Sequence, residues 1–182
     1  GPYKYAGISY LSLGIGLILQ FAIITLSFIY VINSIISGNL FEALMNFLFI
    51  WIIMSLVTFV LTLIAGVFSI LLYNETNEAL LIVSAVFLFI SSIFSLFKMY
   101  LWVISMFFVL SFLFIGNIID LITFIVFGIS MIELSNLIGD ERVKTGGIII
   151  LIGGILLIIL GIGYVILAVG LIYVGRNLMM YD

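Results

Sequence analysis

Few side chains in this chain could do chemistry, and most of those lie inside apolar stretches. The candidates are two ionisable residues, Lys98 and Asp120, and two amide residues, Gln20 and Asn117. A charged group inside a membrane is costly, so such a residue is by default a candidate for an ion or proton pathway. On this interpretation Lys98 and Asp120 form a buried pair, with Gln20 and Asn117 as polar companions.

A second interpretation places each charge at a membrane interface. Lys98 stands beside Tyr100 and Trp102, a grouping typical of an interfacial anchor. Asp120 would cap a helix that begins close to it. Glu133 would lie just before a charged loop that starts at Gly139. The sequence leaves both interpretations open.

Enzyme chemistry has little support. The chain contains no histidine and no cysteine, which removes the commonest general base, thiolate nucleophiles and the usual ligands of zinc and haem. Nucleophile-elbow, metalloprotease and phosphate-loop motifs are also missing. We therefore expect no catalytic residue, no metal site and no cofactor. The net charge of -3 without a basic run excludes nucleic acid as a partner.

Composition identifies the solvent of this chain. It has 182 residues, of which 66% are hydrophobic and 7% charged, whereas soluble domains carry roughly 25% charged residues. The solvent is therefore lipid, in which only helices or closed barrels satisfy their backbone. Apolar runs such as "ALLIVSAVFLFI" from Ala79 are continuous and lack the alternation of barrel strands. The fold class is all-α, a polytopic transmembrane helical bundle.

About 20 apolar residues cross a bilayer, and on that measure the chain forms a single integral membrane domain with five spans. Their approximate bounds are 6–36, 44–73, 79–114, 118–138 and 146–175. Two segments could end the third span: "FKMYLW" (97–102) and "IGNIID" (115–120). A break at the second gives five spans and a break at both gives six, while four is also open.

Basic residues favour five spans. With the N-terminus inside, this topology puts Lys4, Arg142 and Lys144 inside and Arg176 outside, as the positive-inside rule prefers. It also predicts that the two termini lie on opposite sides of the membrane.

Glycine is regularly spaced in the last span, "TGGIIILIGGILLIILGIGYVILAVGLIYVG" (145–175). Small residues recur there every seven positions, at Gly147, Gly154, Gly161, Ala168 and Gly175. Seven residues make nearly two helical turns, so these residues form one stripe along which another backbone can pack closely. Gly7 and Gly14 have the same spacing, which predicts that the first and last helices meet along their stripes. Packing against a second copy of the chain is the alternative.

The segment "GISMIELSNLIGD" (128–140), its short charged loop and the glycine-spaced stretch together resemble part of a known family. They are similar to small multispanning membrane proteins of archaea that carry the domain of unknown function 996, with a weaker echo in "YAGISYLSLGIGLIL". The resemblance covers about the last 50 residues. It implies an archaeal cell membrane and no known activity, and no functional residue carries over from it.

These observations predict a structural or accessory integral membrane protein. We expect it to contact membrane lipids and to pack into a homo-oligomer or with partner membrane subunits. The alternative is a small channel or transporter that uses the polar residues around Lys98 and Asp120.

Overall fold

The computed structural model describes residues 1–104, 106–158 and 162–181, and within 98–117 it describes the helical backbone alone. The described chain is helical nearly throughout, with no strand in those ranges. The elements are α1 (Pro2–Ser37), α2 (Leu40–Thr76), α3 (Ala79–Ile104), α4 (Met106–Ile138), α5 (Glu141–Ile155), the short 3₁₀ helix η1 (Leu156–Ile158) and α6 (Ile162–Tyr181).

Among the residues that the structure describes, five segments are long and apolar enough to cross a membrane. They are Pro2–Ser37, Leu40–Thr76, Ala79–Phe97, Ile118–Ile138 and Ile162–Tyr181. This confirms the all-α class with five helices of spanning length, and the chain has the build of a multi-pass membrane protein.

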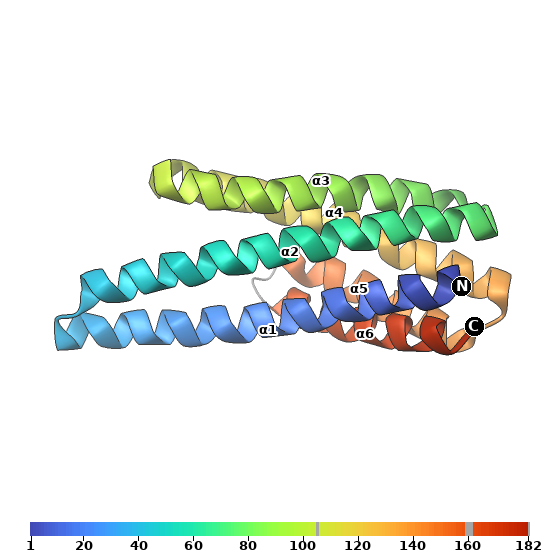
Figure 1. The fold of residues 1–182 in the computed structure, drawn as a ribbon, viewed down its shortest axis with the longest axis horizontal. Coiled ribbons are helices and arrows are strands. Elements are labelled where there is room, and N and C mark those ends of the chain that lie inside the picture. The colour runs from blue at the N-terminus through green and yellow to red at the C-terminus, as the bar shows by residue number, and fades with distance from the viewer. Residues whose placement is uncertain (105, 159–161, 182) are drawn as a thin grey trace.

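The first two helices form a long antiparallel hairpin (Figure 1). Its turn is at Gly38, which adopts a left-handed backbone (φ 83°) and donates its N–H to the Ser34 carbonyl at 3.1 Å. Glycine reaches this conformation without steric strain, so it ends helices in this way. The chain then returns alongside α1 as α2.

The predicted boundary between the third and fourth spans is wrong. Helix α3 ends at Ile104 instead of residue 114, and α4 begins at Met106 instead of residue 118. The segment "IGNIID" (115–120) is part of α4. In lipid a broken helix leaves backbone groups without partners, so a Gly–Asn pair does not end a helix as readily as in water. Asp120 consequently lies in mid-helix and does not cap one.

The predicted single span 146–175 is also wrong, because this stretch folds back on itself. Helix α5 ends at Ile155 and α6 begins at Ile162, and the two halves pack side by side as antiparallel helices (Figure 1). A side-chain Cβ added at Gly163 would lie 2.7 Å from the Gly153 carbonyl oxygen, and one at Gly170 would lie 3.0 Å from that of Gly146. Gly153 and Gly163 lie at equal sequence distances from the end of η1, and so do Gly146 and Gly170. When the chain reverses there, the glycines of α5 therefore face those of α6.

This reversal places both termini at the same end of the bundle (Figure 1). The rings of Tyr3 and Tyr181 lie 4.7 Å apart, centroid to centroid. The prediction that the termini lie on opposite sides is therefore wrong. We call this end the terminal end, and the end with the Gly38 turn the far end.

Charged side chains mark the terminal end. Outside residues 98–117 and 182, every charged side chain except Glu42 and Asp120 lies there. These residues are Lys4, Glu75, Glu78, Glu133, Asp140, Glu141, Arg142, Lys144 and Arg176. Asp140 also caps α5, because its carboxylate accepts the Arg142 backbone N–H at 2.9 Å. The polar boundary of the bundle is thus well defined at one end.

The helices differ in length, which shapes the far end. Helix α1 has 36 residues and α3 has 26, or about 54 and 39 Å at roughly 1.5 Å per residue. The α1–α2 hairpin therefore extends beyond the α3–α4 pair (Figure 1). We call residues 28–49 the projection.

The core lies in the terminal half, and each of the helices α1 to α6 contributes buried side chains to it. Tyr10 is fully buried there and its ring contacts Phe127 edge-on, with centroids 4.8 Å apart. Its hydroxyl shares a 2.7 Å hydrogen bond with Ser69 on α2. One aromatic side chain thus joins three helices, and its polar atom has the partner that a buried hydroxyl requires.

Candidate functional site

The first candidate site is the set of helix-packing residues, and the structure brings α1 and α6 together along it. A Cβ added at Gly7 would lie 2.5 Å from the Gly175 carbonyl oxygen, and one at Gly14 would lie 2.8 Å from the Ala168 carbonyl oxygen. Seven residues forward along α1 correspond to seven residues back along α6. The contact is therefore backbone against backbone, which only small residues permit.

The other half of the predicted stripe faces a different helix. A Cβ at Gly147 would lie 2.9 Å from the Gly128 carbonyl oxygen on α4, and one at Gly154 would lie 3.2 Å from the Ile125 nitrogen. Gly161 lies outside the described residues. The sequence suggested one stripe with one partner, whereas the fold divides it between α4 and α1.

The second candidate site is the predicted ion pathway, of which two members can be placed. Gln20 on α1 accepts a hydrogen bond from the Thr58 hydroxyl on α2. Asp120 lies on α4 and contacts α3 and α6 instead. The side chains of Lys98 and Asn117 lie outside the described residues. The structure thus places Gln20 and Asp120 in separate hydrogen-bonded groups at different helix interfaces.

Asp120 is the centre of a compact polar cluster. Its side chain is 9% exposed. One carboxylate oxygen accepts the Ser91 hydroxyl of α3 at 2.6 Å, and the other accepts the Tyr164 hydroxyl of α6 at 2.7 Å. These lengths are those of hydroxyl-to-carboxylate bonds, the stronger class of hydrogen bond. We call Ser91, Asp120 and Tyr164 the Asp120 centre.

The depth of this centre follows from its position on α4. Asp120 lies about 20 Å along the helix from exposed Glu133, at roughly 1.5 Å per residue. The hydrocarbon core is about 30 Å thick. Tyr164 stands in the first turn of α6, next to the reversal of the α5–α6 hairpin. The carboxylate is therefore deep in the bundle, where the chain turns back.

A further hydrogen bond joins α3 and α4 close to the Asp120 centre. The Thr123 hydroxyl, one turn beyond Asp120, donates to the Phe87 carbonyl of α3 at 3.3 Å and to the Ile119 carbonyl at 2.7 Å. Helices α3 and α4 are thus linked independently of the carboxylate. The link from α4 to α6 in this cluster passes through Asp120 itself.

Sequence reasoning found Asp120 but missed both of its partners. Tyr164 lies well inside an apolar stretch, where a tyrosine hydroxyl must find a hydrogen-bond partner. Ser84 and Ser91 are seven residues apart and both buried on α3, a spacing that marks one helix face. The tyrosine and the serine spacing thus indicated buried polar side chains, but not that Ser91 and Tyr164 would both hydrogen-bond to Asp120.

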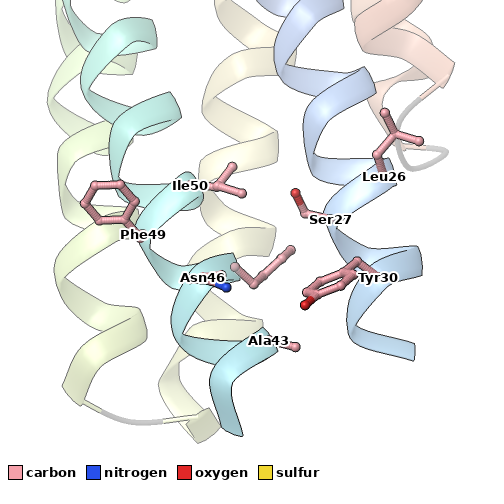
Figure 2. Close-up of a pocket in the computed structure, with 8 residues that line it drawn as sticks. Leu26, Ser27, Tyr30, Ala43, Asn46, Phe49 and Ile50 are labelled. Atoms are coloured by element: carbon pink, nitrogen blue, oxygen red, sulfur yellow. The ribbon is translucent and has the colours of Figure 1, made fainter. Parts of the chain in front are cut away.

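The third candidate site is a groove between the far halves of α1 and α2. Its volume is about 420 Å³. Figure 2 shows Ser27 and Tyr30 on α1 and Ile50 on α2 pointing into the space between the helices, while Phe49 points away from α1. Asn46 also lines the groove. The groove is mostly apolar, with three polar side chains on its walls.

Known proteins do not extend this description: comparison of the chain with family models, curated proteins and solved structures found no match. Among the described residues no three His, Cys, Asp or Glu side chains lie together as a metal site would require.

Proposed function

We propose that the protein is a structural or accessory integral membrane protein, without catalytic activity, which packs into a homo-oligomer or a larger membrane complex. The observation that supports it is the projection, residues 28–49, which extends past the α3–α4 pair and exposes mostly large apolar side chains, with Glu42 as its one charge. The partner that we propose for this surface is a second copy of the chain.

The position of the membrane makes the projection significant. Glu133 and Arg176 each lie five residues before a helix end, or about 8 Å at roughly 1.5 Å per residue. If these charges mark the boundary, a hydrocarbon core of about 30 Å ends about 38 Å along the bundle, near the end of α3. The projection then lies in the headgroup region and beyond it.

Large apolar side chains cover this projection. Ile36 is 86% exposed and Phe41 is 80% exposed. The others with more than a third of their surface exposed are Phe28, Ile29, Tyr30, Ile32, Ile35, Leu40, Leu44, Met45 and Phe49. Lipid tails solvate such residues inside the core, but outside it an exposed apolar patch of this kind marks an interaction surface.

The glycine stripes also indicate that a second copy would bind at the projection. Their faces are occupied within the chain, because Gly7 meets Gly175 and Gly147 meets Gly128. A second copy could not reach these glycines without opening the bundle. Assembly therefore uses the projection and not the stripes.

Single cysteines test this proposal, since the native sequence has none. Ile36→Cys places a thiol on the projection, and Val86→Cys places one on a 49% exposed position of α3 as the matched control. In lipid vesicles under mild oxidation we expect Ile36→Cys to form a disulfide-linked dimer and Val86→Cys to stay monomeric. Equal dimer yields, or a chain that sediments as a monomer, would contradict assembly through the projection.

A small channel or transporter is the second candidate function. It is favoured by the Asp120 centre, a buried carboxylate beside the reversal of a helical hairpin. Discontinuous helices that end at mid-membrane commonly form ion and substrate sites in transporters. Ion flux into vesicles should then fall in Asp120→Asn and persist in Glu133→Gln. Absence of flux from the native protein would contradict it.

We also propose that the terminal end faces the cytoplasm. Four basic residues, Lys4, Arg142, Lys144 and Arg176, lie there, and Glu42 is the charge described at the far end. Basic residues favour the inner side. We further propose that the protein lies in an archaeal cell membrane and belongs to the family with domain of unknown function 996. The resemblance of residues 128–175 to that family supports this proposal. Labelling of Ile36→Cys by an impermeant thiol reagent in intact cells tests the orientation, because a cytoplasmic far end would stay unlabelled.

A further inference from the structure

The groove between the far halves of α1 and α2 combines apolar walls with polar side chains. We propose that it binds one membrane lipid whose headgroup is uncharged and carries hydroxyl groups, as in a glycosyl diacylglycerol. A hydrocarbon chain of this lipid lies against Leu26 and Ile50, and its headgroup hydrogen-bonds to Ser27, Tyr30 and Asn46. The inference uses the membrane boundary given under the proposed function, but it does not require two copies to assemble.

The polar side chains of the groove have hydrogen-bonding capacity that the described chain leaves unused. Ser27, Tyr30 and Asn46 line the groove without a side-chain hydrogen bond to any described residue. By contrast, Gln20 is paired with Thr58 across the same two helices, closer to the terminal end. Lipid tails offer no partner to a hydroxyl or an amide. A bound molecule that supplies hydrogen-bonding atoms would therefore be stabilised here.

The depth of the groove matches the order of parts in a lipid. Leu26 lies about 36 Å along α1 and Tyr30 about 42 Å, at roughly 1.5 Å per residue. The boundary of the hydrocarbon core lies between them, about 38 Å along the bundle. Figure 2 shows the Tyr30 side chain in the space between the helices. Water could solvate this polar end but not the apolar walls, whereas a lipid in its ordinary orientation fits both.

The charges around the groove favour an uncharged headgroup. Residues 5–97, which include both walls, contain no lysine or arginine, the side chains that commonly bind phosphate. Glu42 is four residues from Asn46 and so lies one turn away on the same face of α2. A phosphate would be repelled by this carboxylate. The volume of about 420 Å³ lies within the roughly 300–1,000 Å³ of ligand sites.

The test is fluorescence quenching of the full chain in vesicles by lipids with bromine on their chains. The sequence has two tryptophans, so Trp102→Phe leaves Trp51 as the reporter. Its ring lies 5.9 Å from that of Phe47, which lines the groove. In phosphatidylcholine vesicles we expect brominated galactosyl diacylglycerol to quench Trp51 at a lower lipid fraction than brominated phosphatidylcholine does. Brominated phosphatidylglycerol should quench no better than phosphatidylcholine.

Two variants locate the binding. Tyr30→Phe and Asn46→Leu each remove one hydrogen-bonding group, so each should weaken the preference for the galactosyl lipid by about two- to tenfold. Tyr30→Phe keeps the ring and is the variant that disturbs packing least. The matched control is Asn33→Leu, the same amide-to-apolar change at an exposed position of α1 outside the groove, and it should keep the preference.

Three outcomes overturn the proposal. Equal quenching by the galactosyl lipid and phosphatidylcholine shows that no such lipid is selected. A preference that survives unchanged in both Tyr30→Phe and Asn46→Leu places the lipid elsewhere. Stronger quenching by phosphatidylglycerol than by the galactosyl lipid contradicts the uncharged headgroup. Because the preference is measured at a single chain, a monomeric Ile36→Cys protein rejects assembly through the projection and leaves this site in place.

Discussion

The contact between α1 and α6 makes a quantitative prediction at Gly7. A Cβ added there would lie 2.5 Å from the Gly175 carbonyl oxygen and 2.8 Å from the Met179 backbone nitrogen. Ordinary contacts begin at 3.4 Å, so the two backbones must separate by about 0.9 Å. Neither partner is a flexible side chain that can rotate away. A gap of roughly 0.5–1 Å forfeits a quarter to a half of the dispersion attraction along the contact.

Overpacking usually costs about 1–3 kcal/mol, so the free energy of unfolding of Gly7→Ala is expected to be lower by this amount than that of a variant that gains the same methyl group without the clash. The matched control is Gly16→Ala on the same helix. A Cβ there meets only the terminal Cδ1 of Leu61, at 2.5 Å, which can move aside. Both variants gain the same helix propensity, about 1 kcal/mol, so their difference isolates the backbone clash.

The assay is unfolding in mixed micelles with increasing denaturing detergent, followed by circular dichroism. Gly16→Ala should match or exceed the native midpoint, and Gly7→Ala should unfold earlier. Equal midpoints for the two variants would refute the argument that α1 and α6 touch through their backbones at this position.

Three further predictions concern the hairpin topology and two hydrogen bonds. Cysteines replacing Tyr3 and Tyr181 should be joined within one chain by a short bifunctional thiol reagent, because the two rings lie 4.7 Å apart; a single span from 146 to 175 would put them on opposite sides and give no product. A double-mutant cycle with Gln20→Leu and Thr58→Val should show a coupling of about 0.6 kcal/mol, typical of hydrogen bonds between membrane helices, whereas additive losses would argue against the contact. Tyr10→Phe should cost about 1 kcal/mol in the same unfolding assay, since it removes the hydroxyl bond to α2 and keeps the ring; an unchanged midpoint would contradict that bond.

Assignment of the third and fourth helices shows where sequence rules developed for water fail. The Gly116–Asn117 pair is a turn signal in a soluble protein, yet α4 continues through it. Backbone groups in lipid have no solvent to replace a lost helical hydrogen bond. Because the helix continues through this pair, Asp120 lies in the middle of α4, whereas the sequence predicted that it would cap a helix.

The sequence by itself determined the solvent of this protein and the type of its elements. With 66% hydrophobic and 7% charged residues, the chain must lie in lipid and must be helical. Because ionisable residues are rare in its apolar stretches, Asp120 could be recognised from the sequence as a candidate functional residue. The seven-residue spacing likewise predicted that Gly7, Gly14 and Gly175 pack closely against another helix.

Only the tertiary structure decided which surfaces meet. A seven-residue spacing is the same whether the helix continues or the chain reverses, so it could not show that Gly146 faces Gly170 across a hairpin. Asp120 is bonded to Ser91 and Tyr164, 29 and 44 residues away, and no local pattern encodes such distances. Local sequence sets the spacing along one helix, whereas the pairing of helices depends on how the whole chain folds back.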